Sequence, residues 1–249
     1  MPTVLITGCS SGFGLETARL FFDRGWNVVA TMRTPRPDVL AESDRMRVLP
    51  LDVTDPDSVA RAIADAGEID VLVNNAGFGA PSPIELTSRE TARSLFETNT
   101  LGTLNVIQAV LPRFRQRRAG VVINVSSTVT LKPLPIVGLY RASKAAVNAM
   151  TESLAVEMAP FGVRVHLVLP GRSPETRFGE NARVHMRGLD HTQYGPMIQG
   201  FIASVTQDAG LVTHPADVAA AVWQAATDPA APSRIPAGDD ARQWFAEAA

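Results

Sequence analysis

Short apolar runs recur along this chain, and stretches with helical spacing separate them. Such alternation is typical of parallel strands that are joined by crossover helices and buried on both faces. Right-handed crossovers favour an open sheet with helices on both sides. The runs are Val4–Ile6, Asn27–Thr31, Arg47–Leu49, Val71–Val73, Val121–Val125 and Val163–Leu169, with a short last strand expected within Ser233–Asp240. We therefore predict an α/β fold with a doubly wound open parallel sheet of about seven strands.

Chain length and helix signals complete this expectation. A chain of 249 residues suits one α/β domain that spans residues 1–249. Thr87–Pro112 and Val137–Pro160 are predicted to be the two longest helices, and Asp55 is predicted to cap another one. The segment from about 172 to 210 lacks a clear period through its first half, which is typical of a lid or binding loop.

A cluster of glycines follows the first apolar run and precedes a helical pattern. Gly8, Gly12 and Gly14 are spaced Gly-x-x-x-Gly-x-Gly, and Gly25 stands where that helix would end. Glycines at such a turn let the backbone approach a pyrophosphate, which then sits at the positive end of the helix. The turn therefore predicts nucleotide binding on a Rossmann-like fold. The expected contacts are Gly8, Ser10, Ser11, Gly12, Phe13 and Gly14.

Tyr140 and Lys144 are spaced i and i+4, so both lie on one face of a helix. A lysine charge beside a phenol favours the phenolate and lowers the pKa of the tyrosine. Lowering that pKa from about 10 to about 7 requires roughly 4 kcal/mol. A buried cation and a second positive charge from a cofactor are the expected sources of this stabilisation. The spacing alone is also common on ordinary helix surfaces.

Four motifs in order give the chain a family resemblance. Thr7–Gly14, Asn74–Gly77, Ser127 and Tyr140-x-x-x-Lys144 resemble the single-domain branch of the short-chain dehydrogenase/reductase family, and the similarity runs from Thr3 to about Gly171. The form of the C-terminal part resembles the steroid- and retinoid-reductase-like members. The resemblance implies a carbonyl or alcohol substrate held by Ser127, with Tyr140 as acid or base. It also implies that Lys144 binds the nicotinamide ribose and that Asn99 holds a water in a proton relay.

The end of the second strand indicates which dinucleotide binds. Met32 stands where NAD-preferring members place an aspartate, and Arg33 follows it. An arginine there accommodates a 2′-phosphate, and Ser11 can add a hydroxyl donor. We therefore predict NADP(H), against the alternative that Arg33 merely faces solvent.

Further cofactor contacts rest on the resemblance. Asp52 and Val53 match the adenine contacts, although Asp52 also suits a turn before Thr54. The remaining predicted contacts follow the fourth strand or lie in the turn after the sixth strand. In that turn, Thr176 stands one residue later than the threonine of the family. The expected contacts are Asn75, Ala76, Gly77, Pro170, Gly171 and Thr176, together with Tyr140 and Lys144.

Net charge, apolar runs, histidines and the cysteine indicate which classes of partner and ligand to expect. The formal charge of −2 favours neither nucleic acid nor an anionic membrane, and no long apolar run predicts a membrane span. The four histidines lack metal-ligand spacing, so no metal is expected, and His166 is predicted to be structural. Cys9, the one cysteine, is interpreted as a small filler, with a reactive thiol as the alternative, and a cytoplasmic location is expected. Arg113–Arg118 is interpreted as a solvated helix end.

The leading hypothesis is an NADP(H)-dependent enzyme that interconverts a small apolar carbonyl compound and its alcohol. The alternatives are a non-catalytic NADP(H)-sensing protein and a dehalogenase of the same fold, which would lack the glycine turn and Lys144. A homodimer or homotetramer is expected. An alanine stripe on the Tyr140 helix is attributed mainly to packing against the sheet and in part to a subunit contact; it consists of Ala142, Ala145, Ala146 and Ala149.

Overall fold

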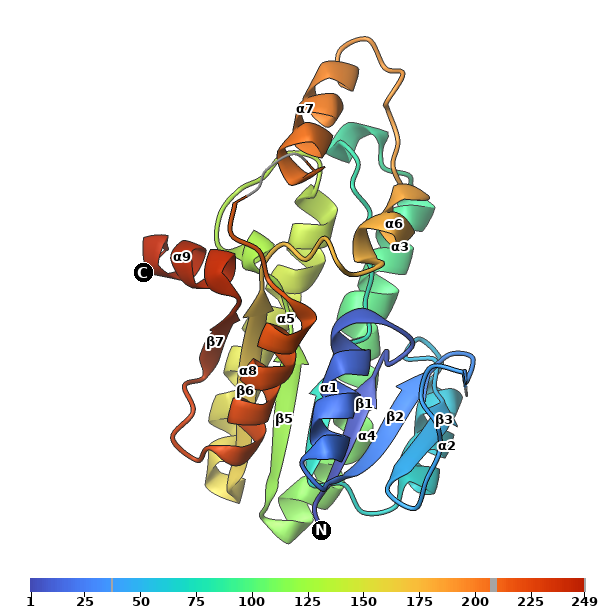
Figure 1. Cartoon of the computed structure of the whole chain (residues 1–249), viewed down its shortest axis with the longest axis vertical. Coiled ribbons are helices and arrows are strands. Elements are labelled where there is room, and N and C mark those ends of the chain that lie inside the picture. The colour runs from blue at the N-terminus through green and yellow to red at the C-terminus, as the bar shows by residue number, and fades with distance from the viewer. Residues whose placement is uncertain (37, 207–209, 249) are drawn as a thin grey trace.

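A parallel sheet forms the centre of the computed structural model, which describes residues 1–36, 38–206 and 210–248 (Figure 1). Within these residues the sheet has seven strands in the order β3-β2-β1-β4-β5-β6-β7. The strands are β1 (Thr3–Thr7), β2 (Asn27–Met32), β3 (Met46–Pro50), β4 (Val71–Asn74), β5 (Gly120–Val125), β6 (Val163–Pro170) and β7 (Arg234–Ala237). The predicted apolar runs all lie in strands, and the predicted open parallel sheet is confirmed.

Strand order reverses between β1 and β4, which pair in register with Leu5 opposite Leu72. From β1 the chain first builds outward through β2 to β3, and then returns to add β4 on the other side of β1. The crossovers that leave two neighbouring strands in opposite directions open a crevice at their carboxyl ends. This crevice positions the candidate site.

Helices cover both faces of the sheet, as predicted. Helices α1 (Gly12–Asp23) and α8 (Pro215–Thr227) pack on one face, where Val4 and Ile6 of β1 point. Leu5 points to the opposite face, which helices α2, α4 and α5 cover. The strands are apolar at nearly every position because both sides are buried in this way. The second set of helices comprises α2 (Pro56–Ala66), α4 (Gly102–Arg117) and α5 (Gly138–Met158).

An aromatic cluster joins α1 to α8 on the first face. The Phe21 ring lies edge-on to Trp26 with centroids 5.0 Å apart and to Trp223 with centroids 5.1 Å apart. Phe21 is fully buried. Edge-to-face pairs of this kind add about 1 kcal/mol each to the burial of their apolar area. The cluster therefore holds α8 against α1, the helix that follows the glycine turn.

The long helix predicted over Thr87–Pro112 is interrupted. Helix α3 (Arg89–Phe96) passes through a π-helical turn at Glu97–Leu101 before α4 begins. Helix α4 continues beyond Pro112, because a proline inside a helix removes one hydrogen bond without always ending the helix. The predicted Val137–Pro160 helix is confirmed as α5, and Asp55 caps α2 by accepting from the Asp57 amide at 2.9 Å.

The segment from 172 to 210 contains helices that its sequence did not reveal. Helix α6 (Phe178–Arg183) and helix α7 (Gly195–Thr206) lie in it, and α7 projects beyond the sheet at the top of Figure 1. Residues 207–209 of this predicted lid lie outside the described residues. The remaining elements are the short turns η1 (Ile84–Leu86), η3 (Thr128–Thr130) and η4 (Ala159–Phe161), and helix α9 (Asp239–Glu247).

The alanine stripe of α5 faces outward, which corrects the prediction that it packs mainly against the sheet. Ala142, Ala145 and Ala149 are exposed, whereas Ser143 and Val147 are buried. The polar residues of α5 take the inner positions near the site, so the small apolar residues fall on the other side. The outer face of α5 therefore exposes small apolar residues in its first half, followed by Glu152 and Ser153.

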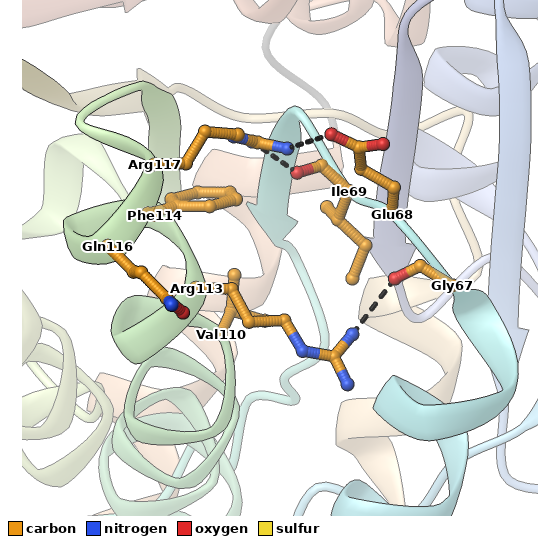
Figure 2. A pocket seen from close by; sticks show the side chains of 8 residues that line it. All are labelled: Gly67, Glu68, Ile69, Val110, Arg113, Phe114, Gln116 and Arg117. Atoms are coloured by element: carbon orange, nitrogen blue, oxygen red, sulfur yellow. Dashed lines mark hydrogen bonds and ion pairs between the residues drawn. The ribbon is translucent and has the colours of Figure 1, made fainter.

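Arg113 and Arg117 hold the loop that joins α2 to the amino end of β4 (Figure 2). Arg113 donates to the carbonyls of Gly67 at 2.9 Å and Ile63 at 3.2 Å, and Arg117 donates to those of Ile69 and Ala119. Arg113–Arg118 ends α4 and exposes Arg113, Arg115 and Arg118 as interpreted, and two of its arginines also bind this loop. These side chains line a cavity of about 360 Å³ at the ends of α2 and α4.

Candidate active site

The candidate site lies at the carboxyl edge of the sheet, where the central strands end together. Gly8 follows β1, Asn74 ends β4, Ser126 follows β5 and Pro170 ends β6. Because the strands are parallel, the segments that follow them converge on one crevice. The predicted motifs therefore meet in space, although they are spread over most of the chain.

The glycine turn is built tightly against its neighbours. Gly8 has φ +77° and Gly12 has φ +58°, which other residues adopt at a cost. A Cβ on Gly14 would overlap the Gly8 carbonyl, and one on Gly8 would lie 2.9 Å from Cα of Ala76. The Ser11 side chain makes no capping hydrogen bond at the start of α1, so its hydroxyl and the first helical N–H groups suit a phosphate.

Asn75 fastens the glycine turn to the end of β4. Its side-chain amide donates to the carbonyls of Thr7 at 2.9 Å and Gly8 at 3.2 Å. The backbone N–H groups of Asn75 and Ala76 both donate to the Thr7 hydroxyl at 3.0 Å. Asn75, a predicted cofactor contact, thus positions the turn by donating its side-chain amide hydrogens to backbone carbonyls at the end of β1.

The structure separates Ser127 from its neighbour Ser126. The Ser126 hydroxyl donates to Oδ1 of Asn148 at 2.5 Å. The Ser127 hydroxyl accepts weakly from the Val129 amide at 3.3 Å, and it acts to lower the pKa of the Tyr140 phenol. Both serines are buried, but only Ser127 acts on Tyr140 in this way. This supports the choice of Ser127 that the resemblance implied.

Tyr140 and Lys144 are both buried on α5, and the pKa of Tyr140 shifts in the direction opposite to the prediction. Burial raises the pKa of Tyr140 to about 12, although the Ser127 hydrogen bond acts to lower it. Burial also lowers the pKa of Lys144 to about 8. The Lys144 ammonium donates to the Val125 carbonyl at 2.9 Å. In this structure desolvation therefore outweighs the predicted influence of Lys144 on the phenol.

Asn99 is fixed by the π-helical turn and is fully buried. Its side chain accepts from the Phe78 amide, and it donates to the Phe78 carbonyl and the Ser143 hydroxyl, each at 3.0 Å. A Cβ on Gly77 would lie 2.9 Å from Oδ1 of Asn99 and 3.4 Å from Nζ of Lys144. Asn99 thus ties the segment after β4 to helix α5.

The adenine side of the predicted cofactor site is more open. Arg33 is exposed immediately after β2, beyond buried Met32. Oδ1 of Asp52 accepts from the Thr54 amide and hydroxyl, which is the alternative turn role. Val53 is buried against Gly102, and its carbonyl accepts from Asn105. Asp52 and Val53 are therefore held rigidly at the crevice by contacts within the protein.

The turn after β6 extends from Pro170 and Gly171 towards the glycine turn. A Cβ on Gly12 would lie 3.4 Å from the Thr176 side chain, so Thr176 stands directly over the start of α1. The Thr176 hydroxyl donates to the Ser173 carbonyl at 2.9 Å. The extra residue before Thr176 is accommodated within this bend, and the residue still reaches the crevice.

Phe178 is a site residue that the sequence did not reveal. Its ring lies 5.5 Å from that of Tyr140, and it also packs against Gly79. Phe178 begins α6, so the lid segment reaches the tyrosine through an aromatic contact. An aromatic residue in an irregular segment was the only available signal, and its partner depends on tertiary structure.

The model of the short chain dehydrogenase family matches residues 2–186. This chain belongs to the short-chain dehydrogenase family. Among its relatives, 3-ketodihydrosphingosine reductase of Bacteroides thetaiotaomicron is 34% identical over 98% of this chain and 90% of the relative. Retinol dehydrogenase 8 of Bos taurus is 40% identical over 68% of this chain and 58% of the relative.

Solved structures agree with this membership. A short-chain dehydrogenase from Streptomyces avermitilis has a TM-score of 0.82 and 32% identity, covering 99% of this chain and 91% of the other. A serine dehydrogenase in its closed form with NADP+ has a TM-score of 0.81 and 29% identity, covering 94% of this chain and 93% of the other. The fold and the order of motifs in this short-chain dehydrogenase are thus those of known oxidoreductases.

Other candidate groups of this short-chain dehydrogenase have structural contacts. Cys9 is fully buried, and burial raises the pKa of its thiol to about 12, as a small filler requires. Nδ1 of His166 lies 2.9 Å from the Pro232 carbonyl, in agreement with its predicted structural role. Within the described residues no group of three or more His, Cys, Asp or Glu side chains could hold a metal ion. No helix in that part of the chain is long and apolar enough to cross a membrane.

Proposed function

We propose that the chain is an NADP(H)-dependent oxidoreductase that interconverts a ketone or aldehyde and its alcohol. The observation that carries this proposal is the burial of Ser127, Tyr140 and Lys144 at one edge of the sheet, where Ser127 acts to lower the pKa of the Tyr140 phenol. A carbonyl reduction needs a donor that holds the oxygen and an acid that protonates it. The two hydroxyls supply these two groups at one point of the crevice.

In the proposed mechanism Ser127 holds the substrate oxygen and Tyr140 gives it a proton. A phenol with a pKa of about 12 is protonated at neutral pH, which is the state an acid requires. In the oxidative direction the same oxygen accepts the proton, and the ammonium of Lys144 favours that charged state. The bound nicotinamide supplies or accepts the hydride. Lys144 would bind the nicotinamide ribose, and Asn99 would hold a water of the proton relay.

The dinucleotide fits the glycine turn because that turn has no room for side chains. Gly8, Gly12 and Gly14 leave backbone exposed to a pyrophosphate, and Ser11 offers an uncommitted capping hydroxyl. Arg33 at the end of β2 suits a 2′-phosphate. The NADP+ bound to the similar serine dehydrogenase supports this choice of cofactor. We propose one nucleotide-binding domain for residues 1–249, with the lid segment over its crevice.

The substrate is proposed to be apolar. Phe178 covers Tyr140, and a cavity of about 480 Å³ begins at Gly138, two residues before that tyrosine. Its walls are mainly aliphatic, and its polar residues Glu85 and Tyr194 are hydrogen-bonded to each other at 2.6 Å. Small-molecule sites are typically lined in this way.

The test is a screen of ketones and aldehydes in which the loss of NADPH absorbance is followed. Tyr140→Phe is expected to abolish turnover while NADPH still binds, because only the phenolic hydroxyl is removed. Gln116→Ala, an exposed position near the end of α4, is the control and is expected to keep turnover. Full turnover by Tyr140→Phe would refute the assigned acid. Binding of NADPH without turnover on any tested carbonyl would favour the sensing protein.

A further inference from the structure

The turn after β6 is held by residues from the far end of the chain. The Gly171 amide donates to the Thr213 hydroxyl at 2.8 Å, and the Arg172 amide donates to Oδ2 of Asp240 at 2.6 Å. The Thr213 amide donates back to the Arg172 carbonyl at 2.8 Å. Three backbone groups of the turn are therefore fixed by one threonine and one aspartate.

Thr213 and Asp240 are themselves joined. The Thr213 hydroxyl lies 2.7 Å from the Ala237 carbonyl and 2.7 Å from Oδ1 of Asp240, so its single proton has two acceptors within reach. Oδ1 of Asp240 also accepts from the Ala241 amide at 2.8 Å. Thr213 is fully buried, which makes the loss of any partner costly.

Two glycines make room for this cluster. A Cβ on Gly171 would overlap the Asp240 carboxylate, and a Cβ on Gly238 would overlap Thr213. Gly238 also has φ +102°, in the region that favours glycine. The absence of a side chain at Gly171 is thus required by Asp240, independently of any approach by a cofactor.

Asp240 is well placed to carry its charge. It lies in the first turn of α9, where the helix dipole favours a carboxylate. Helix α9 directly follows β7, whose Ala237 pairs with Pro170 of β6. The cluster therefore joins the last strand and helix to the segment that leads to Thr176 over the glycine turn.

We infer that Thr213 and Asp240 are positioning residues for the nicotinamide half of the cofactor. They act by fixing the backbone at Gly171 and Arg172 and contact no cofactor atom themselves. This inference rests on the proposed function and on the family resemblance, which implies that the turn after β6 closes over the nicotinamide. The adenine half lies at Arg33 and does not depend on the cluster.

The experiment compares two ligands on the full-length chain. NADPH and adenosine 2′,5′-bisphosphate, which lacks the nicotinamide half, are titrated calorimetrically against each variant. Asp240→Ala and Thr213→Val are expected to weaken NADPH binding by about tenfold, because a buried hydrogen-bonding group loses its partner. Binding of the bisphosphate is expected to stay within about twofold of the wild type.

Matched controls separate positioning from general damage. Asp239→Ala removes the neighbouring carboxylate, which is exposed and pairs with Arg242, and is expected to bind NADPH as the wild type does. Thr213→Ser keeps the hydroxyl and is expected to restore binding. Asp240→Asn preserves the size of the side chain and provides a folded variant should Asp240→Ala fold poorly. Its expected loss of NADPH affinity is severalfold.

The outcomes are distinguishable. If folded Asp240→Asn and Thr213→Val bind NADPH as the wild type does, or lose both ligands equally, the inference is overturned. If the wild type prefers NADH, the predicted cofactor is refuted. The variants are then titrated with NADH and with ADP, which lacks the nicotinamide half. A wild type that binds neither dinucleotide overturns the proposed function and this inference together.

Discussion

Tyr140 and Lys144, the proposed catalytic pair, show how burial alone shifts the pKa values of two neighbouring side chains. Each side chain is less than a tenth exposed, and both pKa values move towards the neutral form. The phenol is consequently a donor at neutral pH, and the ammonium loses much of its solvation. A positive charge on a bound ring would act against the shift at Tyr140, because it favours the phenolate.

The pKa of Lys144 predicts a pH-dependent stability. Lysine has a pKa of 10.5 in the unfolded chain and about 8 in the folded one, so unfolding binds a proton between these values and wild-type stability rises with pH there. Lys144→Met removes this dependence. The variant's stability relative to the wild type is expected to fall by about 2 kcal/mol between pH 7.5 and 10. Urea unfolding of the cofactor-free proteins measures it, and a difference independent of pH would contradict the shifted pKa.

Arg33 predicts the dinucleotide preference. Arg33→Asp replaces a guanidinium that can bind the 2′-phosphate with a carboxylate that repels it. We expect affinity for NADPH to fall by about a hundredfold and affinity for NADH to stay the same or rise. Titration of both dinucleotides measures the ratio. Arg36→Asp is the control, because Arg36 already pairs with Asp38; equal effects at both positions would argue against a specific phosphate contact.

Sequence reasoning selected candidate residues that the structure brings together, but it did not describe what each of them contacts. Tyr140 and the glycines could be predicted because their spacing is itself the signal. Asn75, Val53 and Gly171 were predicted as cofactor contacts. In the structure each of them also contacts a distant residue of the same chain closely. Those partners lie far away along the chain, and a linear pattern does not carry that information. Phe178 and Asp240 escaped prediction for the same reason.

At the scale of elements, the π-helical turn at Glu97–Leu101 determines where Asn99 points. Such turns shift the register of a helix, so a side chain can leave the regular face. Here Asn99 reaches both Phe78 and Ser143, which a regular helix with the predicted bounds did not suggest. The interruption therefore connects the segment after β4 with the helix that bears Tyr140.

Asn99→Ala tests this connection. The change leaves the Phe78 backbone groups and the Ser143 hydroxyl without their partner in a fully buried place. We expect a loss of about 3 kcal/mol in the free energy of unfolding. Urea denaturation measures it, with exposed Gln116→Ala of α4 as the control. A loss as small as that of the control would show that the bridge contributes little.

The predicted elements were most reliable where both faces are buried. The strands and α5 follow long apolar or helical patterns, and they were predicted close to their observed bounds. Helix α6 has six residues and completes fewer than two turns, so its sequence shows no repeating pattern that would distinguish it from a loop. The direction of the alanine stripe was misjudged because the polar site residues of α5 occupy its inner face.

The whole molecule presents this outer face of α5 as a candidate subunit contact. Ala142, Ala145 and Ala149 are exposed, and Val156 further along is 76% exposed. We predict that the chain forms a dimer through this face. Ala145→Arg is expected to convert the dimer to a monomer, because a buried unpaired charge costs several kcal/mol. Light scattering after size exclusion measures the mass, with exposed Ala60→Arg on α2 as the control; an unchanged mass would exclude α5 from the interface.

The tryptophans give the molecule a natural division of optical signals. The indoles of Trp26 and Trp223 lie 5.7 Å apart between α1 and α8. Trp244, the third in the chain, stacks under the Lys132 ammonium at 3.7 Å on α9. Emission from the first two therefore reports the integrity of the helix layer, whereas the third reports the docking of the terminal helix. Replacing Trp244 with phenylalanine would leave only the emission of Trp26 and Trp223. The difference from the wild-type emission would then report the terminal helix during unfolding.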